Sequence, residues 1–110
     1  MKGSNLGEFE ELVLLSIGAL ADDAYGVSIK DFIKERTKRS PSIGALHSAL
    51  SRLEDKGYIN AEVGEATNVR GGRRKKYYQI TIAGKEALRM SKELRTEIYQ
   101  MIPNLNFVLA

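Results

Sequence analysis

Hydrophobic residues recur at helical spacing through residues 40–59, and the rest of the chain is organised around this stretch. The spacing predicts a helix over residues 40–56 with one apolar stripe facing a core, formed by Ile43, Leu46, Ala49, Leu50 and Leu53. Ser40 can cap this helix, and Pro41 suits its first position, where the missing N–H group is not needed. Gly57 supplies the left-handed residue that commonly follows a helix end.

The opposite face of this predicted helix is almost free of bulky side chains. A helix surrounded by water usually carries lysine and glutamate there, whereas a helix that enters the major groove of DNA, about 12 Å wide, gains from small residues. The pattern therefore indicates a DNA-reading helix. The residues expected on this face and its flanks are Ser42, Gly44, Ala45, His47, Ser48, Ser51, Arg52 and Asp55.

Two strand-forming runs follow this helix. Residues 58–63 and 75–81 are rich in Tyr, Ile and Val, and the pattern predicts a hairpin whose turn contains Gly71 and Gly72. Five positive charges fall within seven residues, at Arg70, Arg73, Arg74, Lys75 and Lys76. The formal net charge of the chain is +3, so everything outside this segment sums to −2. A positive patch so concentrated is typical of a surface that binds a polyanion.

Two further helices are expected before the DNA-reading helix. The first is capped by Ser4 or Asn5 and ends near Leu20, with Glu8, Glu10 and Glu11 where the helix dipole favours anions. It is apolar on more than one side, so we expect a second subunit to cover part of it. The next, residues 25–38, is capped by Asp22 or Asp23, and Tyr25, Ile29, Phe32 and Ile33 face inward. Its basic end either matches the helix dipole in solvent or contacts phosphates, or does both, through Lys34, Arg36, Lys38 and Arg39.

Thr81 is expected to cap a last helix over residues 82–102, which Pro103 ends. Positions spaced four and three apart form a short coiled-coil seam, which predicts a homodimer when packed against the first helix of a partner. The alternative is that both helices pack only within their own subunit. The residues predicted at the dimer interface are Leu6, Phe9, Leu12, Val13, Ala87, Leu88, Ser91, Leu94, Ile98 and Met101.

These elements predict a mainly α fold with a small β-hairpin: a winged helix-turn-helix with an additional C-terminal dimerisation helix. We expect one domain over residues 1–110, with the winged helix in 6–81, the dimerisation helix in 82–102 and a tail in 103–110. The apolar tail residues Leu105, Phe107, Val108 and Leu109 are expected to fold back onto protein.

Composition narrows the function classes. Without cysteine the chain has neither a disulfide framework nor a thiolate metal site, which suits the cytoplasm. The longest nearly apolar run, residues 12–21, falls short of the ~20 residues that span a bilayer, and the first residues lack a signal-peptide core, so we expect a cytoplasmic protein with no membrane partner. His47 is the only histidine, and no acid–base pair or phosphate-binding loop is visible. We therefore predict no metal, no cofactor and no enzymatic activity.

An ordered set of motifs resembles the PadR family of bacterial transcriptional regulators, in its short members without a separate C-terminal domain. The resemblance covers about residues 6–102, through LGEFEELVLLSIGAL, YGVSIKDFI, SIGALHSALSRLEDKGYI, GGRRKKYYQIT and TIAGKEAL. It implies a homodimer that binds palindromic double-stranded DNA, often as a repressor released by a small molecule. Carried over, Gly44, Ser48, Ser51 and Arg52 would face the major groove, and residues 71–74 would form the wing tip. Many members have Thr-Leu-Tyr-Pro at residues 45–48, where this chain has Ala-Leu-His-Ser; the missing tyrosine hydroxyl removes a DNA contact that the resemblance implies, so the resemblance leaves the operator sequence open.

The expected division of labour is that basic residues fix register on phosphates while the outer face of residues 42–52 reads bases. For Arg52 we favour a phosphate contact over a guanine contact, and a surface ion pair with Asp55 is the alternative. An effector pocket at the dimer seam would lie near Phe9, Leu12, Leu88 and Tyr99, although simple interface core explains these residues better. A winged-helix module that binds protein or only dimerises, without specific DNA binding, is the competing hypothesis.

Overall fold

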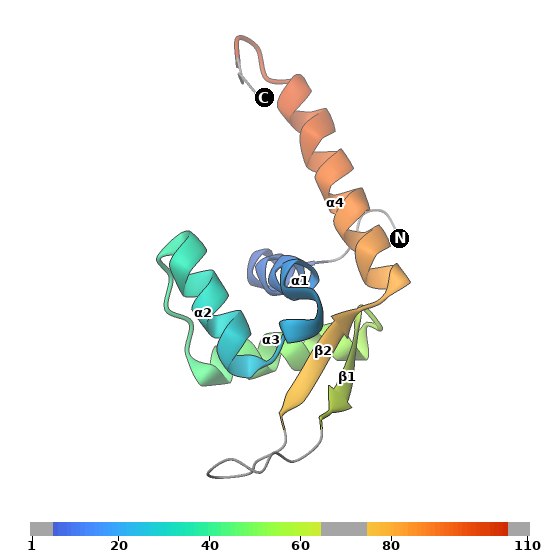
Figure 1. Cartoon of the computed structure of the whole chain (residues 1–110). Helices are drawn as coiled ribbons and strands as arrows, with labels where there is room; N and C mark the ends of the chain where they lie inside the picture. The colour runs from blue at the N-terminus through green and yellow to red at the C-terminus, as the bar shows by residue number, and fades with distance from the viewer. Residues whose placement is uncertain (1–5, 65–74, 106–110) are drawn as a thin grey trace.

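In the computed structural model, residues 6–64 and 75–105 are described, and they form a mainly helical fold with one antiparallel hairpin (Figure 1). This is the predicted winged-helix architecture with an additional C-terminal helix. The elements in chain order are α1 (Glu8–Leu20), the short 3-10 helix η1 (Ala21–Asp23), α2 (Gly26–Thr37), α3 (Ile43–Asp55), β1 (Ile59–Val63), β2 (Lys76–Ile80) and α4 (Ile82–Gln100).

The core lies where α1, α2 and α3 meet the inner face of the hairpin. Apolar residues three and four apart on each helix form a stripe, and these stripes meet in one cluster. Its largest fully buried side chains are Val13, Leu14, Ile17, Ile29, Ile33, Leu46, Leu53 and Ile59. Leu15 on the other side of α1 is half-exposed, so one side of this helix is left uncovered by its own chain.

The start of α3 differs from the prediction by two residues. Ser42, not Ser40, is the cap, and its hydroxyl accepts a hydrogen bond of 3.0 Å from the N–H of Ala45. Pro41 therefore precedes the helix. The expectation that Ile43 faces the core is wrong: its side chain is 53% exposed, because it stands at the first helical position, before the buried stripe that begins at Leu46.

The predicted caps of the first two helices are also wrong. The backbone of Gly7 caps α1, and its N–H lies 3.5 Å from the carboxylate of Glu10. Asp22 and Asp23 lie in η1, so α2 is capped at Tyr25, whose N–H donates to the hydroxyl of Ser28 at 2.9 Å. The side chain three residues into the helix bonds back to the cap residue in both cases, which fixes the start without a capping Asp or Asn.

The hairpin pairs Ile59 with Ile80 and Ala61 with Tyr78, in an antiparallel register without a bulge in the described residues. Ile59 and Tyr78 are buried, because this face packs on the helices. The N–H of Tyr78 donates to the carbonyl oxygen of Ala24 at 2.8 Å, which ties the hairpin to the turn before α2. The wing therefore begins from a fixed base.

Three hydrogen bonds at Thr81 join the end of α3 to the start of α4. The Thr81 hydroxyl accepts from the N–H of Gly84 at 3.0 Å, as the predicted cap should, and donates to the carbonyl oxygen of Gly57 at 2.7 Å. The Thr81 N–H donates to the carbonyl oxygen of Tyr58 at 3.0 Å. Gly57 has a φ of +78°, the left-handed conformation that glycine adopts without strain.

Beyond this joint, α4 projects away from the body of the molecule (Figure 1). Its first half packs on α1, but each residue from 92 to 105 is exposed. The helix ends at Gln100, two residues before the predicted end. Within residues 6–64 and 75–105, no helix combines the length and apolar character needed to cross a bilayer.

Candidate nucleic-acid interface

The outer face of α3 is open. Ser42, Gly44, Ala45, His47, Ser48, Ser51 and Arg52 are all exposed, as the sequence predicted. A Cβ atom added at Gly44 would meet no heavy atom within 4 Å, so nothing in the described chain obstructs this end of the helix. Serine hydroxyls both donate and accept hydrogen bonds. The face can therefore approach another molecule closely and offer it short polar groups.

The hairpin and α3 lie on the same side of the molecule. In Figure 1 both lie below α1, whereas the projecting part of α4 points the opposite way. Gly44, Ser48 and Ser51 are exposed rather than turned into the core. The two elements that the sequence assigned to DNA are thus available to a single ligand.

Arg52 pairs with Glu10 of α1, and the predicted alternative of an ion pair with Asp55 is not formed. Its Nε donates to Glu10 Oε2 at 2.5 Å, and Lys56 Nζ donates to Glu10 Oε1 at 2.6 Å. Burial by itself raises the pKa of the Glu10 carboxyl, but the hydrogen bonds from Lys56 and Arg52 outweigh it and hold the pKa below its usual value. Glu10 is therefore a carboxylate, and sequence analysis missed its role.

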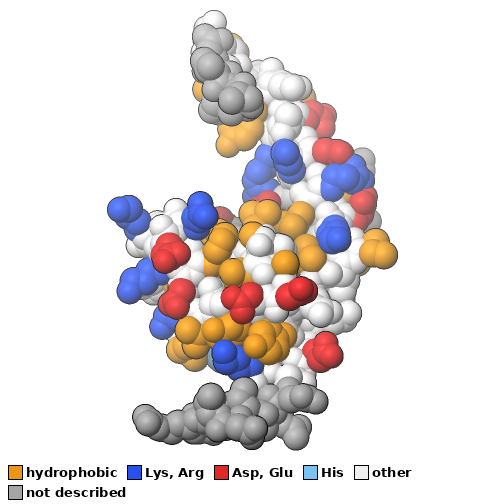
Figure 2. All heavy atoms as spheres, viewed as in Figure 1, with side chains coloured by type: hydrophobic (Ala, Val, Ile, Leu, Met, Phe, Trp, Pro, Cys, Tyr) orange, Lys and Arg blue, Asp and Glu red, His pale blue; other side chains and the backbone are white. Residues whose placement is uncertain are grey.

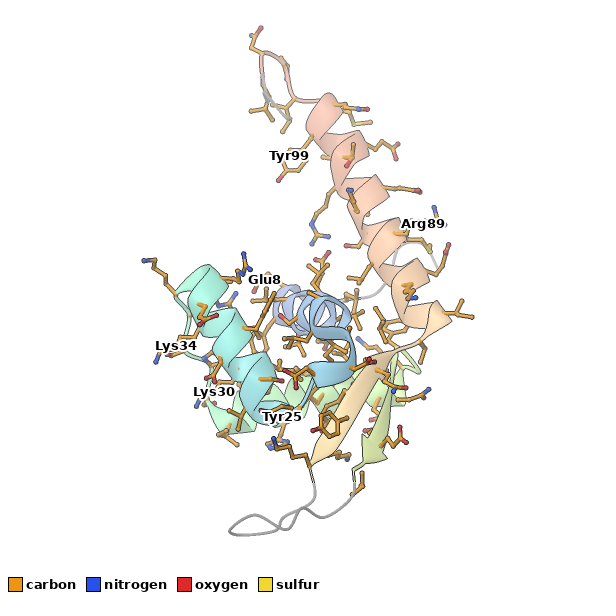
Figure 3. All side chains as sticks on the ribbon, viewed as in Figure 1. Glu8, Tyr25, Lys30, Lys34, Arg89 and Tyr99 are labelled. Atoms are coloured by element: carbon orange, nitrogen blue, oxygen red, sulfur yellow. The ribbon has the colours of Figure 1, made fainter. Side chains whose placement is uncertain are left out.

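The connection between α2 and α3 carries the second basic group. Lys38 ends α2 in a left-handed conformation and is exposed. Arg39 pairs with Glu8, with Nη1 to Oε2 at 2.7 Å, and its guanidinium lies 5.4 Å from the centre of the Phe9 ring. Figure 3 shows Lys30 and Lys34 projecting from the outer side of α2. Part of the positive charge near the start of α3 is thus paired with Glu8 in the first turn of α1.

At the base of the wing, Lys75 lies over an aromatic ring. Its Nζ is 4.2 Å from the centre of the Tyr25 ring, which in turn meets Tyr77 edge-on at a centroid distance of 5.5 Å. A cation over an aromatic face is attracted by the ring quadrupole, so this contact helps to orient the strand end. The remaining predicted wing residues lie outside the described residues: Arg70, Gly71, Gly72, Arg73 and Arg74.

The predicted dimer residues fall into three groups. Val13 is fully buried in its own core, so its assignment to an interface is wrong, whereas Ala87 and Ser91 are almost fully buried where α4 crosses α1 and leave little surface for a partner. The Ser91 hydroxyl instead donates to Glu11 Oε2 at 3.0 Å. Four others are half-buried: Leu6, Phe9, Leu12 and Leu88. The third group is exposed on the projecting part of α4: Leu94 (48%), Ile98 (51%) and Met101 (70%).

An open groove of about 480 Å³ lies between α1 and α4. Leu15, Leu88, Arg95 and Tyr99 are among its lining residues, so it brings together two of the four residues predicted near an effector pocket. Phe9 lines a different groove, beside Arg39, and Leu12 lines neither. Figure 2 shows hydrophobic side chains gathered across the middle of this face of the molecule, below the projecting part of α4. The described residues contain no cluster of His, Cys, Asp and Glu suited to a metal ion.

Comparison with known proteins places the chain in a family. The model of the transcriptional regulator PadR-like family matches residues 13–90. The uncharacterized protein X of Lysinibacillus sphaericus is 38% identical over 84 residues, which are 74% of this chain and 72% of that protein. Among solved structures, a PadR family transcription regulator from Clostridium difficile is 28% identical with a TM-score of 0.68, over 84% of this chain and 93% of the other.

Two further structures agree. A transcriptional regulator from Clostridium thermocellum is 28% identical with a TM-score of 0.69, over 91% of this chain and 92% of the other. A PadR-like transcription factor from Bacteroides fragilis, at 22% identity and a TM-score of 0.72 over 84% of each chain, shares the fold. The chain therefore belongs to the PadR-like family of transcriptional regulators, as its motifs indicated.

Proposed function

We propose that this chain represses transcription by binding a palindromic operator in double-stranded DNA as a homodimer. The observation that carries the proposal is the unobstructed outer face of α3, where no heavy atom lies within 4 Å of a Cβ placed on Gly44. Glycine, alanine and serine on that face allow the helix to enter a major groove and bring polar groups near base edges. The role is regulation in the cytoplasm rather than catalysis.

The basic residues supply affinity in this proposal. Lys38, Arg39 and the wing residues Arg70, Arg73 and Arg74 contact phosphates on either side of the reading helix. Lys75 orients the base of the wing through its contact with Tyr25. Because α3 carries few groups that read bases, DNA shape and half-site spacing supply part of the specificity.

The dimer rests on the apolar residues of the projecting part of α4. Leu94, Ile98 and Met101 are between 48% and 70% exposed, which a lone helix in water would not favour. A second copy with two-fold symmetry covers them and places two α3 helices on the two halves of a palindrome. The groove between α1 and α4 lies next to this surface, so a small molecule bound there can release the operator by changing how the two subunits meet.

Selection of bound duplexes from a pool of random sequence tests the proposal. We expect enrichment of sites with two-fold symmetric halves about one helical turn apart. Gly44→Glu is the control variant, because it adds bulk and negative charge to the open face without meeting a neighbour in the fold. It should fold but enrich nothing. If the unaltered protein enriches no sequence either, the alternative of a protein-binding or dimerisation module replaces DNA recognition.

A further inference from the structure

We infer that Glu10 of α1 is a positioning residue for DNA, because it orients the guanidinium of Arg52 so that its outer edge can bind a backbone phosphate. The inference rests on the proposed function, since it concerns how α3 engages DNA. It adds a residue from outside the helix-turn-helix to the machinery of recognition. Neither Glu10 nor its pairing with α3 can be found from the pattern of α3 itself.

The carboxylate of Glu10 is held rigidly. Both of its oxygens accept hydrogen bonds, one from Arg52 Nε of α3 at 2.5 Å and the other at 2.6 Å from Nζ of Lys56, the residue that caps the end of α3. Its side chain is only 10% exposed, and the next turn of α1 is fixed by the buried residues Val13 and Leu14. The Glu10 carboxylate therefore acts as a fixed hydrogen-bond acceptor for the N–H donors at the end of α3.

Arg52 is held at one end only. The bond to Glu10 uses Nε–H, one of the five N–H donors of a guanidinium, and the other four belong to Nη1 and Nη2. The Arg52 side chain is 52% exposed, whereas its partner is almost covered. The forked Nη end is therefore the part of this half-exposed side chain left for a ligand, and Ser48, one turn earlier on α3, is exposed as well. A planar guanidinium fork matches two oxygens of a phosphate. Because the bond to Glu10 already restricts the Arg52 side chain before DNA binds, the phosphate contact costs less conformational entropy.

Glu10→Gln is the decisive variant, because it keeps the shape and removes the charge. Glu11→Gln is its matched control: the adjacent residue makes the same change in net charge but contacts Ser91 and Arg95 of α4 instead of α3. Any general gain in attraction to DNA from losing one negative charge is then common to both variants. The probe is a labelled duplex of mixed sequence, because a phosphate contact does not depend on the bases.

We expect Glu10→Gln to bind the duplex roughly fivefold to tenfold more weakly than Glu11→Gln. The slope of log affinity against log salt should also become shallower, by up to about 0.9 for each phosphate that the variant no longer neutralises. A purely structural role would lower the melting temperature without changing that slope. Equal affinity of the two variants, or tighter binding by Glu10→Gln, overturns the inference.

Arg52→Lys keeps the inference testable even where Glu10→Gln fails to fold. Lysine keeps the charge but lacks the fork, so it cannot bond Glu10 through one end and a phosphate through the other. We expect Arg52→Lys to lose a similar factor in affinity, and Glu10→Gln added to it to cost nothing further. Binding by Arg52→Lys at the level of the unaltered protein overturns the inference. Failure of the unaltered protein to bind any duplex at low salt removes the proposed function and this inference together, whereas binding by the unaltered protein with no loss of affinity in the variants removes only the inference.

Discussion

Gly84 in the first turn of α4 lies directly against the backbone of Tyr58. A Cβ added at Gly84 would overlap the Tyr58 carbonyl oxygen and would lie 2.9 Å from Cγ1 of Ile80. Because the obstacle is backbone, it cannot swing aside. We expect Gly84→Ala to lower the free energy of unfolding by about 1–3 kcal/mol, measured by thermal or urea unfolding.

Gly18→Ala in α1 is the control for that change. It makes the same substitution within a helix, but its Cβ would lie 3.8 Å from Cδ1 of Ile80, an ordinary contact. Alanine favours the helix over glycine, so this variant should be as stable as the unaltered protein or more stable, by up to ~1 kcal/mol. Equal stabilities of the two variants would show that α4 does not approach Tyr58 this closely.

The ion pairs of Glu10 with Arg52 and Lys56 predict that the stability of the fold depends on pH. Its bonds to Lys56 and Arg52 hold the pKa of Glu10 below the usual value in the folded protein. A depressed pKa in the folded state stabilises the fold above the pKa of the unfolded chain, and this contribution disappears as the pH falls through the folded value. Urea unfolding across the acid range should show this loss in the unaltered protein.

Glu10→Gln should be less stable at neutral pH, by on the order of 1–2 kcal/mol, and should lose less stability on acidification. The difference in free energy of unfolding between the two proteins should shrink toward low pH. A constant difference across the range would mean that the carboxylate charge contributes nothing to the fold.

The exposed apolar residues of α4 predict the oligomeric state. Ile98→Glu places a charge in the surface assigned to the second subunit, so we expect sedimentation equilibrium to show monomers where the unaltered protein forms dimers. Binding to a palindrome should weaken strongly with it. Gln100→Glu, which adds the same charge to an exposed polar position of α4, should leave the dimer intact. A dimer that survives Ile98→Glu moves the interface elsewhere.

Substitutions in the wing and in α3 should change DNA binding in different ways. Replacing Arg73 and Arg74 by Ala should weaken binding to every duplex alike and reduce its salt dependence, because phosphates carry no sequence information. Ser48→Ala or Ser51→Ala should instead change the preference among sequences at similar salt dependence. Competition between selected and scrambled duplexes separates the two effects. Arginine variants that altered only the preference would contradict this division of labour.

The sequence predicted most of the fold because its signals are local. Helical spacing identified the α-helices α1 to α4, and Thr81 and Gly57 act as predicted, since each is determined by its neighbours in the chain. Local signals failed where two residues offer the same chemistry: Ser40 and Ser42 can both cap, and the structure uses Ser42. Val13 was misplaced for a related reason, because α1 is apolar on several sides and its pattern does not say which side packs inward.

The site was predicted less completely. The small residues on the outer face of α3 were found because their lack of bulk is visible in sequence. The pairing of Glu10 with Arg52, 42 residues apart, was not, because an ion pair between distant residues depends on how the helices cross. The helix dipole accounted for the acidic first turn of α1, so nothing in the sequence required a second role.

The joint at Thr81 has a consequence for a two-subunit assembly. The Thr81 side chain bonds both Gly57, two residues beyond the end of α3, and the first turn of α4, so it links the orientations of the two helices. In the proposed homodimer, the angle at which two copies of α4 cross would then set the distance between the two α3 helices. A compound that altered this angle would change the distance between the two α3 helices, and so the half-site spacing that the dimer can bind, without touching any group that faces DNA.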